Sequence, residues 1–238
     1  MGVGIFTAAS GGTYAGSLAT STDGVTWNRV VTDIYGFAPN GANEVSYTKN
    51  QWFAYCYLYT GAVRLYTSTD GINWGHTDLS NTSHVPFNPM IYDSTSGLYI
   101  GCESIQGITT STDALNWSNR YNISSGNFNS ICHGSGGNYV AVDRTGHYAL
   151  STNHGMAWSS GALPVLNGGH DWYSVCWSDT ALCYEAVMAG GAAVSTDGVH
   201  WSGQATTSTT GVNQVIAGPN IFVAVGNGNI MTNSISFS

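Results

Sequence analysis

The stretch that decides the fold is "STDGVTW", at residues 21–27. Strings of the same kind return further along the chain. They are "STDGINW" at 68–74, "STDALNW" at 111–117, "STNHGMAW" at 151–158, "STDGVHW" at 195–201 and a degenerate "MTNSISF" at 231–237. Their spacing of about 40 residues is typical of chains built from repeated units of four strands.

The segment before each copy repeats as well. In the fourth unit, "NSICHGSGGNYVAVDRTGHYALSTNHG" at 129–155 alternates short apolar runs with Gly-rich turns. This pattern predicts three strands, and the Trp segment after the repeat supplies a fourth antiparallel strand.

We therefore expect an all-β fold, a single β-propeller of about six four-stranded antiparallel blades. The first blade is expected to be incomplete, because its innermost strand is either missing or has to come from residues 1–5. A closure with five blades, or a strand supplied by a partner chain, is the alternative. The expected blades cover roughly residues 1–34, 42–78, 87–121, 128–161, 172–204 and 211–238.

The repeat resembles the Asp-box, or BNR repeat, with its pattern Ser-x-Asp-x-Gly-x-x-Trp. Asp-boxes occur in sialidase-like propellers and in some lectins. Four copies here are one residue shorter, and only "STNHGMAW" has the eight-residue spacing, with Asn153 in place of Asp. The resemblance implies that each copy forms the turn between the third and fourth strands, at the outer rim and away from the usual binding face.

The chemistry of the repeat is local. The carboxylate accepts backbone N–H groups two or three residues further on, and the Ser hydroxyl ties the other arm of the turn. The Trp then packs against a neighbouring sheet. We expect structural roles for Ser21, Asp23, Trp27, Ser68, Asp70, Trp74, Ser111, Asp113, Trp117, Ser151, Asn153, Trp158, Ser195, Asp197 and Trp201.

The loops that join one blade to the next are longer than hairpin turns require, so a ligand site is expected there. An Asn begins the first strand of four blades, and a Tyr holds that place in the fifth. The amides either cap the loops by bonding backbone groups or form a polar site for hydroxyl-rich ligands. The candidate ligand-binding residues are Asn43, Asn88, Asn129, Tyr173, Asn213, Arg64, Arg144 and Trp172.

The composition excludes several classes of partner. Only 8% of residues are charged, Lys and Arg number five, and the formal net charge is −8. No basic patch for nucleic acid or anionic lipid can be built from so few cations. The sequence shows no apolar run long enough for membrane insertion and no visible signal peptide.

Cysteine and histidine spacing indicates neither a disulfide framework nor a metal centre. The five cysteines lie mostly in apolar strand-like runs, where they are expected to be small buried hydrophobic residues. The seven histidines are scattered without the spacing of metal ligands. We expect no metal and no cofactor.

An enzyme is not indicated. A sialidase needs three arginines that converge on the substrate carboxylate, and here only Arg64 and Arg144 are placed for the binding face. The Arg-Ile-Pro motif of sialidases is absent. A glycoside hydrolase with two paired carboxylates is a weaker alternative, because no such pair stands out.

The sequence favours a non-catalytic binding module that recognises carbohydrate through loops on one face. Its partner would be a glycan or a glycoprotein receptor, and the composition suits a virion surface or phage tail appendage made in the cytoplasm. The alternative is a structural subunit that bridges other subunits of a larger assembly. The sequence specifies neither the ligand nor the oligomeric state.

Overall fold

The computed structural model shows only β-structure, turns and loops in the residues that it describes. No helix in these residues is long and apolar enough to cross a membrane. The described residues are 6–10, 17–31, 45–57, 62–80, 84–86, 89–103, 107–122, 127–205, 212–219, 221–226 and 229–234.

The described strands form six antiparallel sheets, each made from consecutive strands of the chain. The first sheet contains β1 (Phe6–Ser10), β2 (Ser17–Ser21) and β3 (Asn28–Val31). The second contains β4 (Ser46–Thr48), β5 (Gln51–Tyr57), β6 (Val63–Ser68) and β7 (Gly75–Leu79). The third contains β8 (Met90–Asp93), β9 (Leu98–Glu103), β10 (Gly107–Ser111) and β11 (Ser118–Tyr121).

The remaining sheets repeat this order. The fourth contains β12 (Phe128–His133), β13 (Tyr139–Asp143), β14 (His147–Ser151) and β15 (Ser159–Ala162). The fifth contains β16 (Trp172–Ser178), β17 (Cys183–Met188), β18 (Gly191–Ser195) and β19 (Ser202–Ala205). The sixth contains β20 (Gln214–Gly218), β21 (Ile221–Gly226) and β22 (Asn229–Ser234).

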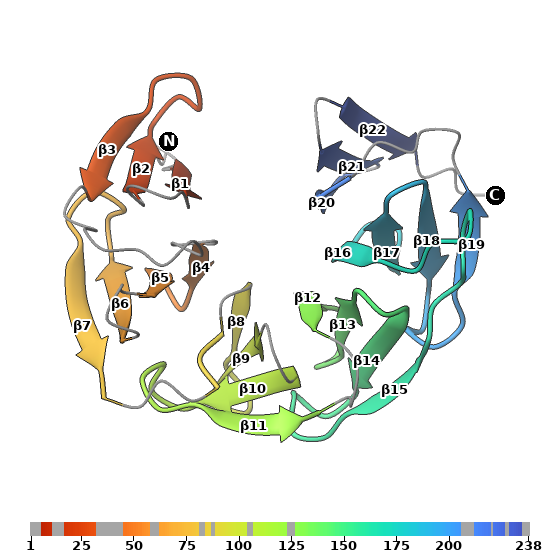
Figure 1. Ribbon diagram of the computed structural model, residues 1–238, viewed down its shortest axis with the longest axis horizontal. Helices are drawn as coiled ribbons and strands as arrows, with labels where there is room; N and C mark the ends of the chain where they lie inside the picture. Colours follow the sequence, from red (N-terminus) through yellow and green to blue (C-terminus); the bar gives the residue numbers. More distant parts are fainter. Residues whose placement is uncertain are drawn as a thin grey trace.

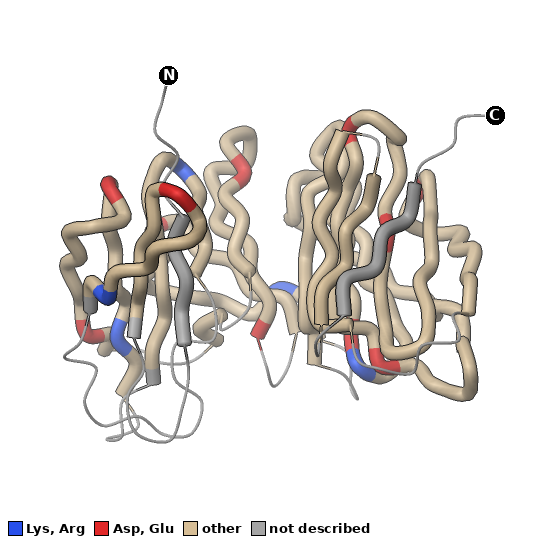
Figure 2. Tube along the Cα trace, turned by 90° about the horizontal axis from the view of Figure 1, so that it is seen from above, with Lys and Arg blue, Asp and Glu red and all other residues tan. Residues whose placement is uncertain are grey.

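The sheets follow one another around an arc in chain order (Figure 1). The strands β4, β8, β12, β16 and β20 lie toward the centre, and β7, β11, β15 and β19 form the outer wall. An opening separates the first sheet from the sixth, and Figure 2 shows it from a second direction together with the sparse charged residues.

The core lies between neighbouring sheets. The middle strands β10 and β13 are buried along their whole length, whereas the outer strand β19 is exposed. Apolar side chains from two sheets meet in each cluster, such as Val140 and Leu150 of the fourth sheet with Val175 of the fifth. Burial on both faces explains the near-continuous apolar runs in the sequence.

Hydroxyl groups on the inner strands add polar links between sheets that the sequence did not indicate. The Ser46 hydroxyl accepts the backbone N–H of Met90, at 3.0 Å. The Ser174 hydroxyl accepts the N–H of Val215 in the same way, at 3.2 Å. These bonds satisfy buried backbone groups on the inner strands.

The first sheet has three described strands, as its short segment predicts. The sixth sheet also has three, and the fourth strand expected at 235–238 lies outside the described residues. All five cysteines are free thiols, with Cys56, Cys102 and Cys132 buried and the other two half-buried. The expectation of unpaired, mostly buried cysteines is confirmed.

Candidate functional site

The turns at 21–27, 68–74, 111–117, 151–158 and 195–201, called the repeat turns below, share one hydrogen-bond pattern. In the first of them, Asp23 Oδ1 accepts the N–H groups of Val25 and Thr26, at 2.8 and 2.7 Å. The Ser21 hydroxyl oxygen accepts the N–H of Gly24 at 2.8 Å. The N–H of Thr26, followed by that of Val25, lowers the pKa of Asp23 to about 2. The carboxylate is therefore occupied by its own turn.

The Trp of a repeat turn packs against the sheet that precedes it in the chain. Trp117 of the third sheet is 4% exposed and lies among Tyr55 and Leu65 of the second sheet. The Tyr55 hydroxyl also donates to the carbonyl of Ala114 at 2.6 Å. Trp27 differs: it is 44% exposed, and no sheet of the described residues precedes the one that carries it.

The fourth repeat turn has a second function as a link between sheets. Its extra residue is His154, which adopts a positive φ of 59°. His154 Nδ1 lies 2.8 Å from Oδ2 of Asp93, which ends β8 in the third sheet. The one repeat with an unusual length is thus the one whose added side chain reaches the neighbouring sheet.

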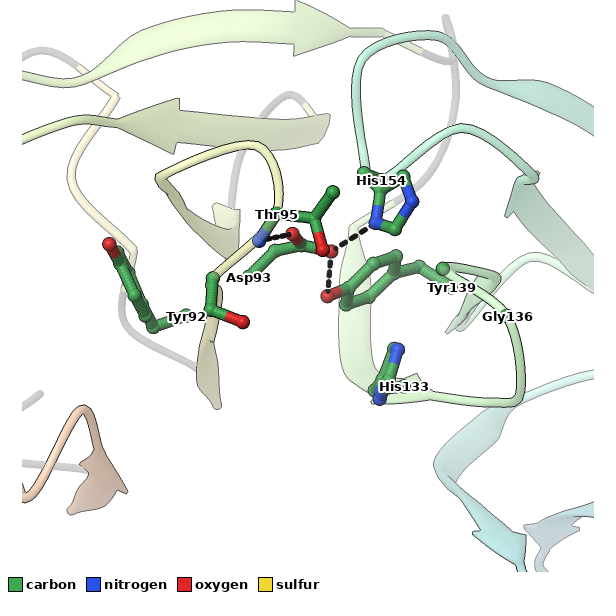
Figure 3. A pocket seen from close by; sticks show the side chains of 9 residues that line it. Tyr92, Asp93, Thr95, His133, Gly136, Tyr139 and His154 are labelled. Carbon is green, nitrogen blue, oxygen red and sulfur yellow. Dashed lines mark hydrogen bonds and ion pairs between the residues drawn. The ribbon is translucent and has the colours of Figure 1, made fainter.

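Asp93 is the centre of this arrangement (Figure 3). Its Oδ1 accepts the N–H groups of Thr95 and Ser96, both at 2.8 Å, and Oδ2 also accepts the Tyr139 hydroxyl at 2.8 Å. Burial alone would raise the pKa of Asp93, which is 5% exposed, but the bonds from Ser96, Tyr139, His154 and Thr95 outweigh it. The pKa of Asp93 therefore lies below its ordinary value, and the carboxyl is ionised.

A pocket of about 390 Å³ opens beside Asp93, between the β8–β9 turn, the β12–β13 turn and the fourth repeat turn. Tyr139 and His133 face it from the fourth sheet, with ring centroids 4.8 Å apart. Gly137 keeps the pocket in shape: a Cβ there would lie 2.4 Å from the His154 ring, and its φ is +81°. The result is a small cavity with an ionised floor and the exposed His133 ring at its rim.

The pocket lies on the face of the molecule that carries the repeat turns, called the turn face below. In an antiparallel four-stranded sheet the first and third hairpin turns lie at the same edge. The long connections between sheets lie at the opposite edge, the loop face, where the sequence predicted the ligand.

The pocket residues Asp93, His133, Tyr139 and His154 were not predicted from the sequence, although the odd spacing of "STNHGMAW" was visible there.

The predicted ligand residues lie apart from this pocket. The Asn129 side-chain amide donates to the carbonyl of Trp172 at 2.7 Å, so it links the fourth and fifth sheets. Trp172 is fully buried. This corrects the expectation that Trp172 lines a ligand site, because its ring points into the core from the first residue of β16. Arg144 and Tyr173 do meet, with the guanidinium 5.9 Å from the ring centroid.

Of the other predicted ligand residues, those that the structure describes do not contact Arg144 or Tyr173. Arg64 pairs with Asp78 of the adjacent strand, with Nη2 3.0 Å from Oδ2, and this bond raises the pKa of Arg64. Asn213 is exposed at the start of the sixth sheet. Asn43 and Asn88 lie outside the described residues.

Other carboxylates of the described residues are also bonded within the protein. Glu103 lies 3.0 Å from His84 Nδ1, and the buried Asp143 accepts the hydroxyl of Thr145 and the N–H of His147. The part of the chain that the structure describes contains no group of three or more metal-ligating side chains.

Comparison with solved structures gives the name of the fold. YCF48 from Cyanidioschyzon merolae has a TM-score of 0.59 at 16% identity, over 92% of this chain and 76% of that one. The WD40 beta propeller domain of Doa1 has a TM-score of 0.58 at 13% identity, over 82% of this chain and 65% of that one. The chain is a β-propeller. A second structure, YCF48 bound to D1 peptide, gives a TM-score of 0.51 at 14% identity, over 98% and 95% of the two chains.

The comparisons support the architecture of this propeller and nothing finer. No protein-family model and no curated protein matches the sequence. The six sheets fit the expected number of blades, so the predicted fold class is confirmed.

Proposed function

We propose that this propeller is a non-catalytic module that binds a protein partner through the pocket on its turn face. The observation that carries the proposal is the pocket itself. Two sheets build it jointly, Asp93 fixes its floor, the exposed His133 ring stands at its rim, and the buried Tyr139 ring packs beside it. A rigid, partly apolar cavity with a few oriented polar groups is a typical recognition site for a side chain.

The described carboxylates already bond to other groups of the protein, and this supports a non-catalytic role. A glycoside hydrolase needs two carboxyl groups that face each other across the substrate bond. The described acids Asp93, Asp143 and Glu103 are each bonded to other groups of the protein. Asp23 and Asp70 are occupied by their own turns.

We also propose that the repeat turns are Asp-boxes in the sense of the sialidase-like propellers. The shared pattern of Ser, Asp and Trp hydrogen bonds supports this. In each described copy the Trp indole N–H donates to a carbonyl three residues earlier, as from Trp117 to Ala114 at 3.3 Å. The proposal assigns these residues to the scaffold and not to the ligand.

Two neighbours in fold give a protein ligand some support. YCF48 has been solved bound to a D1 peptide, and nidogen has been solved in a complex with laminin. Nidogen matches with a TM-score of 0.54 at 12% identity. From those structures we carry over to this chain only the kind of partner, which is a protein.

A glycan on the loop face is the second candidate. The pairing of Arg144 with Tyr173 favours it, because a half-buried ring beside an exposed charged donor suits a sugar. Against it, Asn129 is bonded to the neighbouring sheet and Trp172 is buried. Display on a virion or phage appendage stays a prediction from composition, as does the bridging of a larger assembly.

Selection from a random peptide library displayed on phage tests the proposal. We expect the purified protein to enrich a family of peptides whose affinity falls at least tenfold in His133→Ala, because that change removes one ring of the rim. Arg144→Ala is the matched control on the loop face and should bind these peptides as the wild type does.

Two results would overturn the proposal. One is a family of peptides that depends on Arg144 and not on His133, which would place the site on the loop face. The other is the absence of any enriched peptide together with binding to a glycan array, which would favour the second candidate.

A further inference from the structure

We infer that the pocket receives a cationic side chain, an arginine or a lysine, from the partner. This inference rests on the proposed function and specifies its chemistry. It follows from three features of the pocket: the charge of its floor, the exposed His133 ring at its rim and the absence of Lys and Arg among the residues that line it.

The charge on the floor is fixed. Asp93 is the one acidic residue among those lining the pocket, and neither Lys nor Arg is among them. Its two oxygens already accept four hydrogen bonds, from the N–H groups of Thr95 and Ser96, from the Tyr139 hydroxyl and from His154. A ligand therefore feels the negative charge across the pocket without displacing a partner of the carboxylate. Such a field is stronger in a partly enclosed site than in open water.

The polar group next to the carboxylate is already engaged. Because Asp93 is ionised, the His154 nitrogen that faces it carries the proton of their hydrogen bond. An ammonium or guanidinium group offers only donors. An anionic ligand would find the charge of Asp93 opposed to it.

The exposed ring of His133 supplies a second contact surface, with the buried Tyr139 ring packed beside it. A cation over the face of a Tyr or another aromatic ring is drawn to its electron-rich surface. The protein uses this contact itself at the adjacent turn of the second sheet. Lys49 Nζ lies 4.5 Å from the ring centroid of Tyr92 and 5.6 Å from that of Tyr99. Tyr92 also lines the pocket, but its ring turns away from Asp93 and already carries Lys49, so this contact serves only as an example of the pairing within the same protein (Figure 3).

The net charge of the whole protein also favours a cationic ligand. The formal net charge is −8, which attracts basic segments and accelerates their encounter with the protein. At the rim, a Cβ added to Gly136 would meet nothing within 4 Å, so a long side chain has room to enter beside this turn.

Titration of the protein with small blocked amino acids, followed by NMR, tests the inference. The probes are Nα-acetyl-arginine methylamide and its neutral isostere, the citrulline analogue, with the lysine and norleucine pair alongside. We expect both cationic probes to bind with shifts around His133, and each neutral probe to bind at least tenfold more weakly. Asp93→Asn should abolish that preference, because the shape is kept and the charge is lost.

Asp179→Asn is the matched control, because it removes one exposed charge from the same face outside the pocket. This variant should keep the preference for cations. If Asp93→Asn does not fold, probe binding to the wild type is compared at low and high salt. Salt should weaken the binding of the cationic probes and leave that of the neutral probes unchanged.

Equal binding of arginine and citrulline probes, or tighter binding of an acetyl-glutamate probe, would overturn the inference. Selected peptides that need His133 but contain no Lys or Arg would overturn it too, while leaving the proposed protein-binding function intact. If neither cationic probes nor peptides use the pocket, both proposals are wrong.

Discussion

Asp93 shows how one side chain can hold a site together. It is nearly buried and ionised, which is stable only because hydrogen bonds replace the lost water. Removal of one partner leaves a buried charge less well solvated, and that costs more than the bond itself contributes. Tyr139 and His154 are therefore positioned by the same group that gives the pocket its charge.

Acid is expected to destabilise the protein. The pKa values of Asp23, Asp70 and Asp93 in the folded state lie below their ordinary values near 4. The unfolded chain therefore binds protons first, so these groups stabilise the fold above about pH 4 and lose that effect as the pH falls. Urea unfolding at a series of pH values should show a free energy that declines from about pH 5 toward pH 2. A flat profile between pH 6 and pH 3 would contradict this account.

The roles of the repeat residues could be predicted from the sequence because their partners lie two to three residues away, as between Asp23 and Thr26. The role of Asp93 could not be predicted, because its side-chain partners Tyr139 and His154 are 46 and 61 residues away in the sequence. No local pattern records such a meeting. The extra residue in "STNHGMAW" was the only trace of it in the sequence.

At the level of elements, the turns decide the shape of the pocket more than the strands do. The β12–β13 turn contains two successive glycines in the left-handed region, Gly136 and Gly137, with φ of +65° and +81°. They face different surroundings. Gly137 lies against the His154 ring, whereas Gly136 faces open space.

This pair gives a matched test. Gly136→Ala should cost about 1 kcal/mol, because only the backbone conformation is strained. Gly137→Ala should cost about 2 kcal/mol or more, because the same strain is joined by a collision that displaces His154 from Asp93. Urea unfolding of both variants measures the difference. Equal losses would mean that His154 moves away freely and does not fix the site.

The elements themselves were largely predictable, because each unit repeats the same apolar runs and turns. Trp172 shows where that approach fails. The loop and the strand meet at this residue, and a side chain at such a junction points either to solvent or into the core. The register of β16 shifts between Trp172 and Ser174, and the Trp172 ring packs into the core cluster that the fourth and fifth sheets share.

At the level of the whole molecule, the same contact between neighbouring sheets recurs along the arc, and the first and sixth sheets each have one side without it. Trp74, Trp117, Trp158 and Trp201 each join a cluster that includes the preceding sheet. Within the described part of the chain, Trp27 has no such sheet in front of it. On the sixth sheet, Ile216 and Val225 are exposed on the face that borders the opening.

Trp117→Ala should cost about 3–5 kcal/mol, as for other buried aromatic side chains. Trp27→Ala should cost about 1 kcal/mol or less, because much of its ring already contacts water. The midpoints of urea unfolding compare the two variants. A loss at Trp27 as large as that at Trp117 would show that the first and sixth sheets meet in solution.

The open arc also has a consequence for where order is lost first. Each sheet is held only by its neighbours, as in a linear array whose end units have one interface and whose inner units have two. Fraying then starts at the two termini of the array and moves inward, so local opening is rarest in the middle. Asp93 and Tyr139 join the third and fourth of the six sheets, which is the midpoint. The pocket beside Asp93 thus occupies the junction that partial unfolding reaches last.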